Sequence, residues 1–579
     1  MYYTVGMFID IVPNRNSPPA VLLREGWREG KRVRKRTLAN LSSLPMDQIE
    51  LLRRVLRGEA LVPVEEAFQI LRAQPHGHVA AVLGTMRKLG LPQLLSSRPH
   101  PKRDLALAMI CARVIEPCSK LATARQLGGD TATNSLGEAL GVEDADADDL
   151  YEALDWLVRG QKRIEGKLAR RHLEEGQLIL WDVTTVPFES RTCPLAVYGR
   201  PKRGKSERQL LFGLLTTPEG LPVAVEVFAG NTGDPATVST VLERVQERWG
   251  LERMVVVGDR GMLTSARIEE ELRPRGLDWI TSLRAPTIRK LWAEGPLQLS
   301  LFDDQDLAEI TSPDFPGERL IACYNPLLAQ DRARTREELL QVTEEKLQVV
   351  VEATRREKRA LKGKDKIGVR VGRILGRSKM SKHFRYEITE HAFTFERDDE
   401  SVAQEAALDG IYVLRTSVSA EELGSEAVVE AYKRLSRVEQ AFRISKDFAL
   451  EVGPIRHRRV DRVRAHVFLC MLALYVRLHM ERDLAPILFT DHDTAAAKAR
   501  RTSVVEPATR SQAAEQKVRR KRTEDGLPVQ SFRSLMKSLA TLTKNTVRMG
   551  NTHVEFEQYA QPTPLQTRAF ELLDISYLL

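Results

Sequence analysis

Three acidic residues occupy positions from which carboxylates can hold metal ions. Asp182 lies within Leu178-Ile-Leu-Trp-Asp-Val-Thr-Thr, Asp259 closes Met254-Val-Val-Val-Gly-Asp, and Glu439 lies in the charged segment 431–446. Carboxylate oxygens suit magnesium, and two such ions about 3.5–4 Å apart can bind both the attacking and the leaving oxygen of a phosphodiester. The chain has 79 acidic residues, so each position alone is weak evidence and the three must be judged together.

The segment that contains the two aspartates predicts a mixed α/β unit. Apolar runs predict strands at 178–188, 209–217, 221–228, 254–258 and 278–283. Pro218-Glu219-Gly220 predicts a hairpin turn, Asp234-Pro235 predicts a helix start with Asp as N-cap, and a second helix is expected near 265–273. This is the element order of an RNase H-like core, in which the first and fourth strands are neighbours. We therefore expect Asp182 beside Asp259.

The segment around Glu439 predicts a helix with a functional stripe. Tyr432, Glu439 and Lys446 are seven residues apart, a spacing that returns to the same helix face with about 20° of drift. Leu435, Val438 and Phe442 give an adjacent apolar face for docking on the sheet. The alternative is a solvated charged helix without a role in chemistry.

Together these motifs resemble the DDE transposases of bacterial insertion sequences, in the group with a Tyr-x2-Arg-x3-Glu-x6-Lys (YREK) signature. Tyr432, Glu439 and Lys446 match this spacing, whereas Leu435 occupies the Arg position and Arg434 precedes it. Asp182 and Asp259 match the first two acids of the family by their strand contexts. The resemblance covers about 175–490 and is looser on either side.

The resemblance implies a DNA transposase that cleaves at element ends and transfers the 3′-hydroxyls into target DNA. Its implied catalytic residues and metal ligands are Asp182, Asp259 and Glu439, with two Mg²⁺ per site and Mn²⁺ as a substitute. The implied DNA-binding residues are Tyr432, Lys446, Arg434 and Arg443. The implied partners are the terminal inverted repeats and target DNA, with a homodimer in the DNA complex, no membrane and no nucleotide cofactor.

The spacing of the acids predicts an inserted domain. Asp182 and Asp259 are 77 residues apart, but Asp259 and Glu439 are 180 apart, far more than a bare core requires. Within this interval we expect a long charged helix at 336–361, a basic stretch at 366–382, strands within 383–397 and a last strand at 410–416.

The predicted fold class is α/β, an RNase H-like core interrupted by an insertion, with a mainly helical N-terminal region. Seven segments are expected: a strand-rich basic segment (1–60), a helical DNA-binding region (61–175), the first part of the core (176–290), the insertion (291–425), the second part of the core (426–490), a basic polar linker (491–530) and a helical C-terminal tail (531–579). In the second segment, Ser119 should cap one helix, and another should run from Asp149 to about Leu173.

Composition fits a large soluble enzyme of a cytoplasmic compartment, and the resemblance implies a nucleoid-associated bacterial protein. The chain has 579 residues, a formal net charge of +9 and five scattered cysteines without Cys-x2-Cys pairs, which favours reduced thiols over structural zinc. There is no signal-like start and no uninterrupted apolar stretch near 18 residues. Basic residues cluster at 24–36, 355–382, 456–464 and 517–522, and such clusters neutralise DNA phosphates. Any single cluster is more often a solvated face.

Two further motifs have better structural explanations. Gly199-Arg-Pro-Lys-Arg-Gly-Lys-Ser206 satisfies the phosphate-loop pattern, but a strand rather than a helix is expected after it, so we interpret it as a basic hairpin approach near DNA. Asp144-x-Asp146-x-Asp148 mimics the start of a calcium loop, but Asp149 replaces the required Gly, so helix capping is the better interpretation.

Three side chains carry open alternatives. Trp292 could stack a flipped base, as an aromatic residue of the insertion does in related hairpin-forming transposases, but packing of the insertion against the core is the favoured alternative. His457 and His466 flank a basic run and could touch DNA, although buried or capping roles are favoured.

Two other functions compete with transposition. A decayed transposase could act only as a DNA-binding regulator, but the presence of all three carboxylates opposes this. A stand-alone nuclease could cut without joining, and the sequence does not separate cutting from joining.

Overall fold

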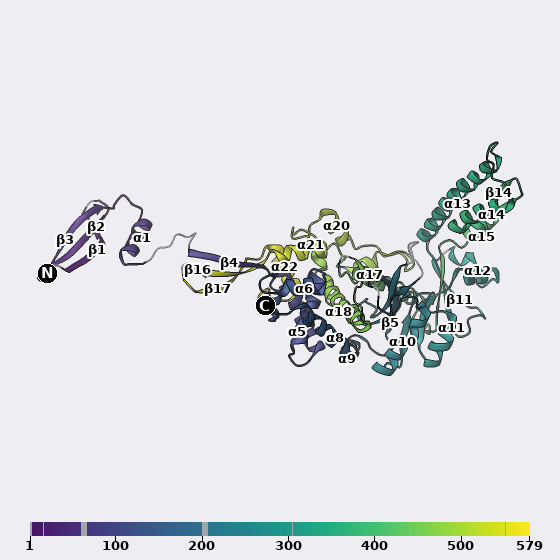
Figure 1. The fold of residues 1–579 in the computed structure, drawn as a ribbon, viewed down its shortest axis with the longest axis horizontal. Helices are drawn as coiled ribbons and strands as arrows, with labels where there is room; N and C mark the ends of the chain where they lie inside the picture. The colour runs from purple at the N-terminus through teal and green to yellow at the C-terminus, as the bar shows by residue number, and fades with distance from the viewer. Residues whose placement is uncertain are drawn as a thin grey trace. The chain divides into compact units, whose positions relative to one another are not determined.

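The computed structural model describes residues 3–15, 17–59, 67–190, 192–199, 207–303, 305–447, 449–550 and 552–579. These residues form two compact units, which are described separately below. The first comprises Met1–Ala73 and Lys544–Ala560, and the second comprises Gln74–Thr543 and Gln561–Leu579 (Figure 1).

The first unit is built mainly from strands. The chain starts with an antiparallel sheet of β1 (Tyr3–Val12), β2 (Ala20–Glu29) and β3 (Arg32–Asn40), followed by α1 (Met46–Leu56). A second sheet has the order β17-β16-β4 and joins distant parts of the chain: β4 (Phe68–Pro75), β16 (Thr543–Met549) and β17 (Glu555–Tyr559). The predicted helical C-terminal tail is therefore incomplete: it contains two helices, but a hairpin that pairs with β4 separates them.

The centre of the second unit is one large mixed sheet. Its strand order is β11-β12-β15-β10-β9-β5-β7-β6, with β8 on β7. The strands are β5 (Leu178–Pro187), β6 (Val197–Tyr198), β7 (Arg208–Thr216), β8 (Pro222–Ala229), β9 (Val255–Val257), β10 (Asp278–Ser282), β11 (Leu307–Ile310), β12 (Arg319–Tyr324) and β15 (Ile411–Thr416). The first and fourth predicted strands, β5 and β9, are parallel neighbours, as expected. β7 and β8 form the predicted hairpin.

Helices precede the sheet in the chain. They are α3 (Gly77–Lys88), α4 (Leu91–Leu95), α5 (Pro101–Ile115), α6 (Lys120–Leu127), α7 (Leu136–Leu140), α8 (Ala147–Arg159) and α9 (Gln161–His172). The side chain of Ser119 caps α6, and Asp146 caps α8 in a capping box with Asp149, which confirms both capping predictions. The single helix expected from Asp149 to Leu173 is instead two helices that meet at Gly160.

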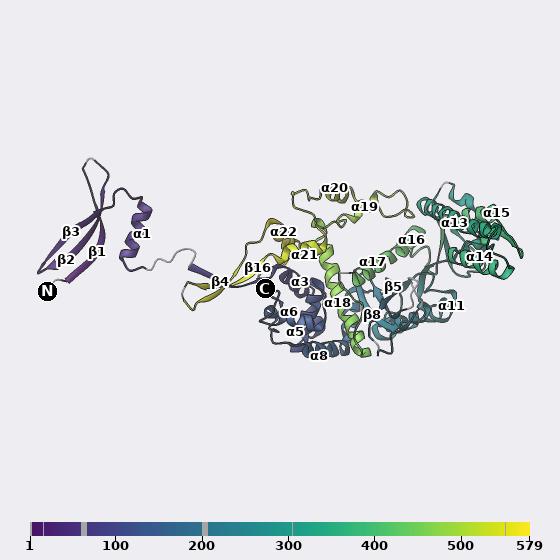
Figure 2. The ribbon, with the colours of Figure 1, turned by 45° about the horizontal axis from the view of Figure 1, so that its top comes forward.

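The interval between Asp259 and Glu439 contributes to the sheet and also forms a core of its own. β11, β12 and β15 extend the sheet beyond β10. The remaining elements include α12 (Ala285–Ala293), α13 (Pro326–Arg355), α14 (Lys364–Ser378), the hairpin of β13 (Phe384–Ile388) and β14 (Phe393–Arg397), and α15 (Asp399–Ala406). α13 and α14 lie next to each other (Figure 2). Together with the hairpin they form a separate apolar cluster that includes Leu347, Val371 and Phe393. The stretch 366–382, expected as a basic segment, is largely the helix α14.

Two helices, not one, carry the residues of the predicted stripe. α16 (Ser425–Lys433) ends before Arg434, and α17 (Leu435–Lys446) follows at once. The N–H of Arg434 donates to the carbonyls of Glu430 and Ala431. The carbonyl of Arg434 accepts a 2.9 Å hydrogen bond from the N–H of Arg437, three residues later in the chain. The prediction of one continuous helix from Tyr432 to Lys446 is therefore wrong.

The helix after this region is the central core helix of the second unit. α18 (Val460–Asp483) is the one helix among the described residues that is long and apolar enough to cross a membrane by length and composition, and 89% of its apolar window is buried within the protein. This burial is that of a core helix. The expected linker at 491–530 contains α19 (Thr494–Ala499) and α20 (Gln512–Arg520), and the C-terminal helices are α21 (Phe532–Ala540) and α22 (Pro564–Leu573).

Candidate active site

The strand register brings the two aspartates to one level of the sheet. Leu180 on β5 pairs with Val257 on β9 in a parallel ladder. Asp182 and Asp259 each lie two residues beyond this pair, and neighbouring strands of a sheet are about 4.8 Å apart. On its other side, β5 pairs with β7, where Asp182 lies opposite Leu214.

Asp182 is half-buried, and its environment disfavours a negative charge. Its Oδ1 accepts a hydrogen bond of 2.8 Å from the N–H of Val183. Burial, followed by the negative charges of Asp259, Glu439 and Asp234, raises the pKa of Asp182 to about 7, against the smaller opposing effect of the Val183 hydrogen bond. Asp259, Glu439 and Asp234 are therefore close enough to act electrostatically on Asp182.

Asp259 is held by the turn that follows β9. Its Oδ1 accepts hydrogen bonds from the N–H groups of Gly261 at 3.0 Å and Met262 at 2.8 Å. The side chain is exposed, so one carboxylate oxygen serves the turn and the group still faces solvent.

Glu439 reaches this region from α17. The buried face of α17 consists of Val438, Ala441, Phe442 and Ser445, and the Phe442 ring packs edge-on against Phe212 of β7 with ring centroids 5.5 Å apart. Glu439 lies on the exposed side of the same helix. Docking of the apolar face on the sheet therefore positions this carboxylate near Asp182.

Tyr432 lies at the end of α16 and also faces the acids. Its hydroxyl lies 2.8 Å from the Oγ of Ser282, at the end of β10. Burial raises the pKa of Tyr432, as do the charges of Asp259 and Glu439, against the opposing effect of the Ser282 hydrogen bond. The helix break therefore does not separate Tyr432 from the acidic cluster.

Of the basic residues expected at the site, Lys446 has the clearest placement. Its Nζ donates to the Oγ1 of Thr184, which is two residues after Asp182 and so on the same face of β5. Arg443 is exposed on α17, one turn after Glu439. Arg434 instead lines a cavity of about 600 Å³ with Arg437, Lys498, Arg501 and other residues of 430–437 and 491–510.

Sequence reasoning missed three residues of this cluster: Asp234, Thr184 and Ser282. Asp234 was predicted to cap a helix, but a 3₁₀ turn begins at Asp234 itself, Gly233 takes the cap position and no side-chain capping bond forms. The Asp-Pro pair was therefore a correct signal for a helical turn but not for the role of the carboxylate. Nothing local in the sequence marks Thr184 or Ser282, because their partners are 262 and 150 residues away.

The donor set suits a hard divalent cation. Carboxylate oxygens are the preferred ligands of Mg²⁺, and a cation would relieve the repulsion that disfavours the charge of Asp182. Within the described parts of the chain, however, no three His, Cys, Asp or Glu side chains are grouped tightly enough to form a ready-made metal site. The acids are thus coupled by charge but do not form a closed cage.

Comparison with family models assigns the chain. The model of the transposase DDE domain matches residues 174–476, which is just over half of the chain and includes Asp182, Asp259, Tyr432, Glu439 and Lys446. The chain belongs to the DDE transposases of bacterial insertion sequences. A second model, the N-terminal domain of the IS1634 family transposases, matches residues 9–63 of the transposase. No curated protein matches the sequence.

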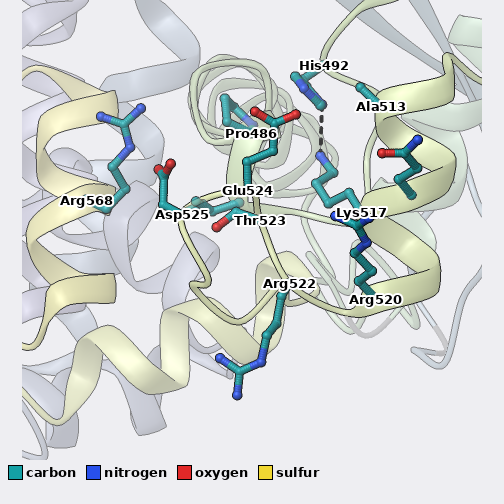
Figure 3. A pocket seen from close by; sticks show the side chains of 12 residues that line it. Pro486, His492, Ala513, Lys517, Arg520, Arg522, Thr523, Glu524, Asp525 and Arg568 are labelled. Carbon is teal, nitrogen blue, oxygen red and sulfur yellow. Dashed lines mark hydrogen bonds between the residues drawn. The ribbon is translucent and has the colours of Figure 1, made fainter.

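One predicted basic cluster of the transposase, 517–522, contains a lysine that is not available to DNA phosphates. In the 517–522 cluster, Lys517 is buried, and its Nζ donates to the carbonyls of Ala485 at 2.7 Å and Thr490 at 2.9 Å and lies 3.1 Å from His492 Nδ1 (Figure 3). Glu524 and Asp525 line the same pocket, opposite Arg568. Lys517 therefore has a structural role, and the mixed charge of this pocket does not suit an anion.

The remaining motifs are resolved in part. Of the phosphate-loop match, residues 200–206 lie outside the described residues, and the strand β7 follows at Arg208, as predicted. All five cysteines are free. His466 is buried and His457 is mostly buried, in agreement with the favoured interpretation.

Proposed function

We propose that this transposase cleaves the ends of its element and joins the freed 3′-hydroxyls to target DNA on an RNase H-like fold. The strand order β8-β7-β5-β9-β10 supports this fold, and the interval 291–425 would be the insertion that interrupts it. The observation that carries the proposal is that the β5–β9 register and the docking of α17 on the sheet bring Asp182, Asp259 and Glu439 toward one another from three elements.

In this proposal Asp182, Asp259 and Glu439 hold two Mg²⁺ ions, with Mn²⁺ as an accepted substitute. The ions would supply Lewis-acid stabilisation of the charge that develops on the phosphodiester oxygens. The carboxylates would hold the ions in place, and the repulsion among the carboxylates in the absence of a cation favours cation binding.

The basic and hydroxyl groups beside the acids would position the DNA backbone. Lys446 is close to the face of β5 that carries Asp182 and would contact a phosphate next to the scissile bond. Tyr432, Arg443 and Arg434 would add further contacts. We assign the chain to the YREK group on the spacing of Tyr432, Glu439 and Lys446, with Leu435 where the signature has Arg.

The rest of the transposase would recognise and assemble the DNA. We assign binding of the terminal inverted repeats to the helices of 61–175 and expect a homodimer in the DNA complex. The basic strands of the first unit, whose β3 is exposed along its whole length, would add non-specific contacts to phosphates.

A strand-transfer assay tests the proposal. Purified transposase, a labelled element end, a plasmid target and Mg²⁺ should give nicked ends and joined products. Asp182→Asn, Asp259→Asn and Glu439→Gln should each reduce both products to background and leave end binding intact, because metal ligands act on the reaction rather than on affinity.

Asp278→Asn is the matched control. Asp278 is a carboxylate of the neighbouring strand β10 and accepts a 2.7 Å hydrogen bond from Ser417. This variant should cleave and join. Robust cleavage by any of the three site variants would overturn the assignment, and cleavage without joining by the wild type would favour a stand-alone nuclease.

A further inference from the structure

A second cluster of chemically active side chains lies around a cavity of about 250 Å³ in the second unit. The cavity is lined from α5, α6, α8, the loop before α18, and α18 itself. Its lining residues that carry charged or titratable groups are Arg113, Cys118, Lys120, Tyr151, Glu451, Arg456, His457 and His466. Positive charge dominates this set.

Two of the basic lining residues, Lys120 and Arg113, are buried without acidic partners among the described residues, whereas Arg456 is exposed and pairs with Glu189 at 2.9 Å. Lys120 is 4% exposed and Arg113 is 6% exposed. Among the described residues, no carboxylate forms an ion pair with either of them. Arg113 donates to the carbonyls of Leu450 at 3.4 Å and Cys118 at 3.1 Å. A buried charge without a counter-charge is unfavourable, so an anion bound in this cavity would stabilise these residues.

One histidine atom points to the same conclusion. His466 is 7% exposed, and its Nε2 lies 3.0 Å from the carbonyl of Val452, so Nε2 carries the proton. Its Nδ1 is buried and has no hydrogen-bond partner. Protonation of Nδ1 would give an N–H donor that an anion could accept. The α6 helix also begins at the cavity, with Ser119 and Lys120 in its lining, and a helix N-terminus favours negative charge.

Two other cavities near basic residues lack this combination. The pocket at Lys517 includes Glu524 and Asp525. The cavity at Arg434 includes Glu430 and Asp491. Here Glu451 is the single carboxylate among the described lining residues, and it is exposed to solvent.

We propose that this cavity binds a phosphate-type oxyanion and that, in the DNA complex, the oxyanion is a backbone phosphate of the bound DNA. The first part stands on the cavity alone, whereas the second rests on the proposed function. Lys120 would donate to the oxyanion, and the negative charge of the oxyanion would favour protonation of the unpartnered Nδ1 of His466. Arg456, which also pairs with Glu189, would lie at the mouth of the cavity.

The position of the cavity relative to the acids supports DNA as the source of the phosphate. Ile455 of the lining loop donates through its N–H to the carbonyl of Pro187, at the end of β5. Pro187 is five residues beyond Asp182, which is about 17 Å along a strand. This length corresponds to about five steps of 3.4 Å along one DNA strand, so a bound duplex is long enough to span the separation between the two sites.

Sulfate binding tests the cavity without DNA or catalysis. Sulfate has the tetrahedral shape of phosphate and does not titrate near neutral pH. Its affinity is measured by thermal shift, with ionic strength held constant by NaCl. Lys120→Gln should weaken sulfate binding about tenfold or more, as expected for the loss of a charge-assisted hydrogen bond. Arg459→Gln changes an exposed Arg near the same loop but outside the lining and should bind sulfate like wild type.

The wild type provides a second measurement that needs no variant. Burial, together with Arg113, lowers the pKa of Lys120 to about 7. An anion favours the charged lysine, so sulfate binding should take up protons and tighten from pH 8 to pH 6. Burial lowers the pKa of His457 to about 4 and that of His466 well below its usual range, with further lowering from the charges of Lys120, Arg113 and, for His457, Arg462. Glu451 and Arg456 are the other charged residues of the lining. Sulfate affinity that is independent of both pH and Lys120 would overturn the oxyanion site.

A DNA measurement distinguishes the two sources. For an element-end duplex, Lys120→Gln should reduce the slope of log K against log salt by about 0.9, the value for one phosphate contact. If sulfate binding depends on Lys120 but this slope does not change, the anion is free in solution and the DNA assignment is wrong. If Lys120→Gln does not fold, Lys120→Met replaces it, because Met has a similar volume and suits a buried position. Both the sulfate affinity and the salt slope of DNA binding are then measured on Lys120→Met. Loss of cleavage by the active-site variants has no bearing on the sulfate result.

Discussion

At the scale of single residues, the acidic cluster depends on groups that hold it from several directions. The carboxylate of Asp259 is fixed by two backbone N–H groups, while Asp182 has one such bond and the more buried position. The negative charge of Asp182 is therefore the least favourable, and its pKa rises to about 7 through burial and neighbouring charges. A site of this kind is poised to accept a cation rather than a further anion.

Lys446 provides the first prediction at this scale. Its Nζ donates to Thr184, so without DNA the lysine rests against the strand that carries Asp182. Lys446→Met should slow single-turnover cleavage more than it weakens binding of the element end, because one phosphate contact is a small part of total DNA affinity. Cleavage rates and Kd values for the same labelled duplex give the two quantities.

Thr184→Val is the matched control for Lys446. It removes the acceptor but leaves the ammonium group, so cleavage should fall less than in Lys446→Met. If Lys446→Met cleaves at the wild-type rate, the phosphate contact is absent. If Thr184→Val is as impaired as Lys446→Met, the hydrogen bond itself, rather than the charge, is what the reaction requires.

At the scale of elements, the break at Arg434 explains how a helical stripe becomes a three-element site. A continuous helix would carry Tyr432, Glu439 and Lys446 along one line. Instead α16 delivers Tyr432 to Ser282 on β10, while α17 delivers Lys446 to Thr184 on β5. The segment contains neither Pro nor Gly to mark the break. The sequence therefore predicted helical residues correctly but predicted one helix where the structure has two.

Trp292 gives a prediction about the element that follows β10. The residue lies on α12 and packs against an apolar cluster that includes Leu283, Leu291 and Leu320. Trp292→Ala should therefore destabilise the fold by about 2–4 kcal/mol, in the range for truncation of a large core aromatic after allowance for partial exposure. Differential scanning fluorimetry or denaturant unfolding measures this effect.

The control for Trp292 is another aromatic residue at a more exposed position. Tyr386 on β13 is 48% exposed, so Tyr386→Ala should lower the melting temperature less. An unchanged melting temperature for Trp292→Ala, combined with a defect after first-strand nicking, would instead support the stacking of a flipped base. The packing observed around the indole favours the first outcome.

At the scale of the whole molecule, local pattern and long-range pairing were predictable to different degrees. The strands that precede the second aspartate could be predicted because their apolar runs and the Pro218-Glu219-Gly220 turn are local signals. The partner of β10 could not, because β15 pairs with it across more than 130 residues, as in Ile280 with Thr416. The addition of β11, β12 and β15 to the same sheet likewise depends on tertiary pairing that periodicity does not encode.

Buried histidines make the stability of the second unit depend on pH. Burial lowers the pKa of His78 to about 4, and His457 and His479 are lowered to about 4 for the same main reason. Because the folded pKa lies below the unfolded value near 6.5, each histidine contributes stability at pH 7 that is lost as pH falls from 6.5 toward 4. The carboxyls of Glu165 and Asp182 act in the opposite direction, since burial raises their pKa to about 7.

A comparison of variants separates these opposing contributions. His78→Asn removes one histidine that must stay neutral, so its stability deficit relative to wild type should shrink by about 2 kcal/mol between pH 7.5 and pH 5.0. Urea unfolding of both proteins at the two pH values measures the difference. His391→Gln, at an exposed position, should show no such change. If the deficit of His78→Asn is the same at both pH values, His78 binds a proton as readily in the folded protein as in the unfolded chain. Its burial then does not control the acid sensitivity of this unit.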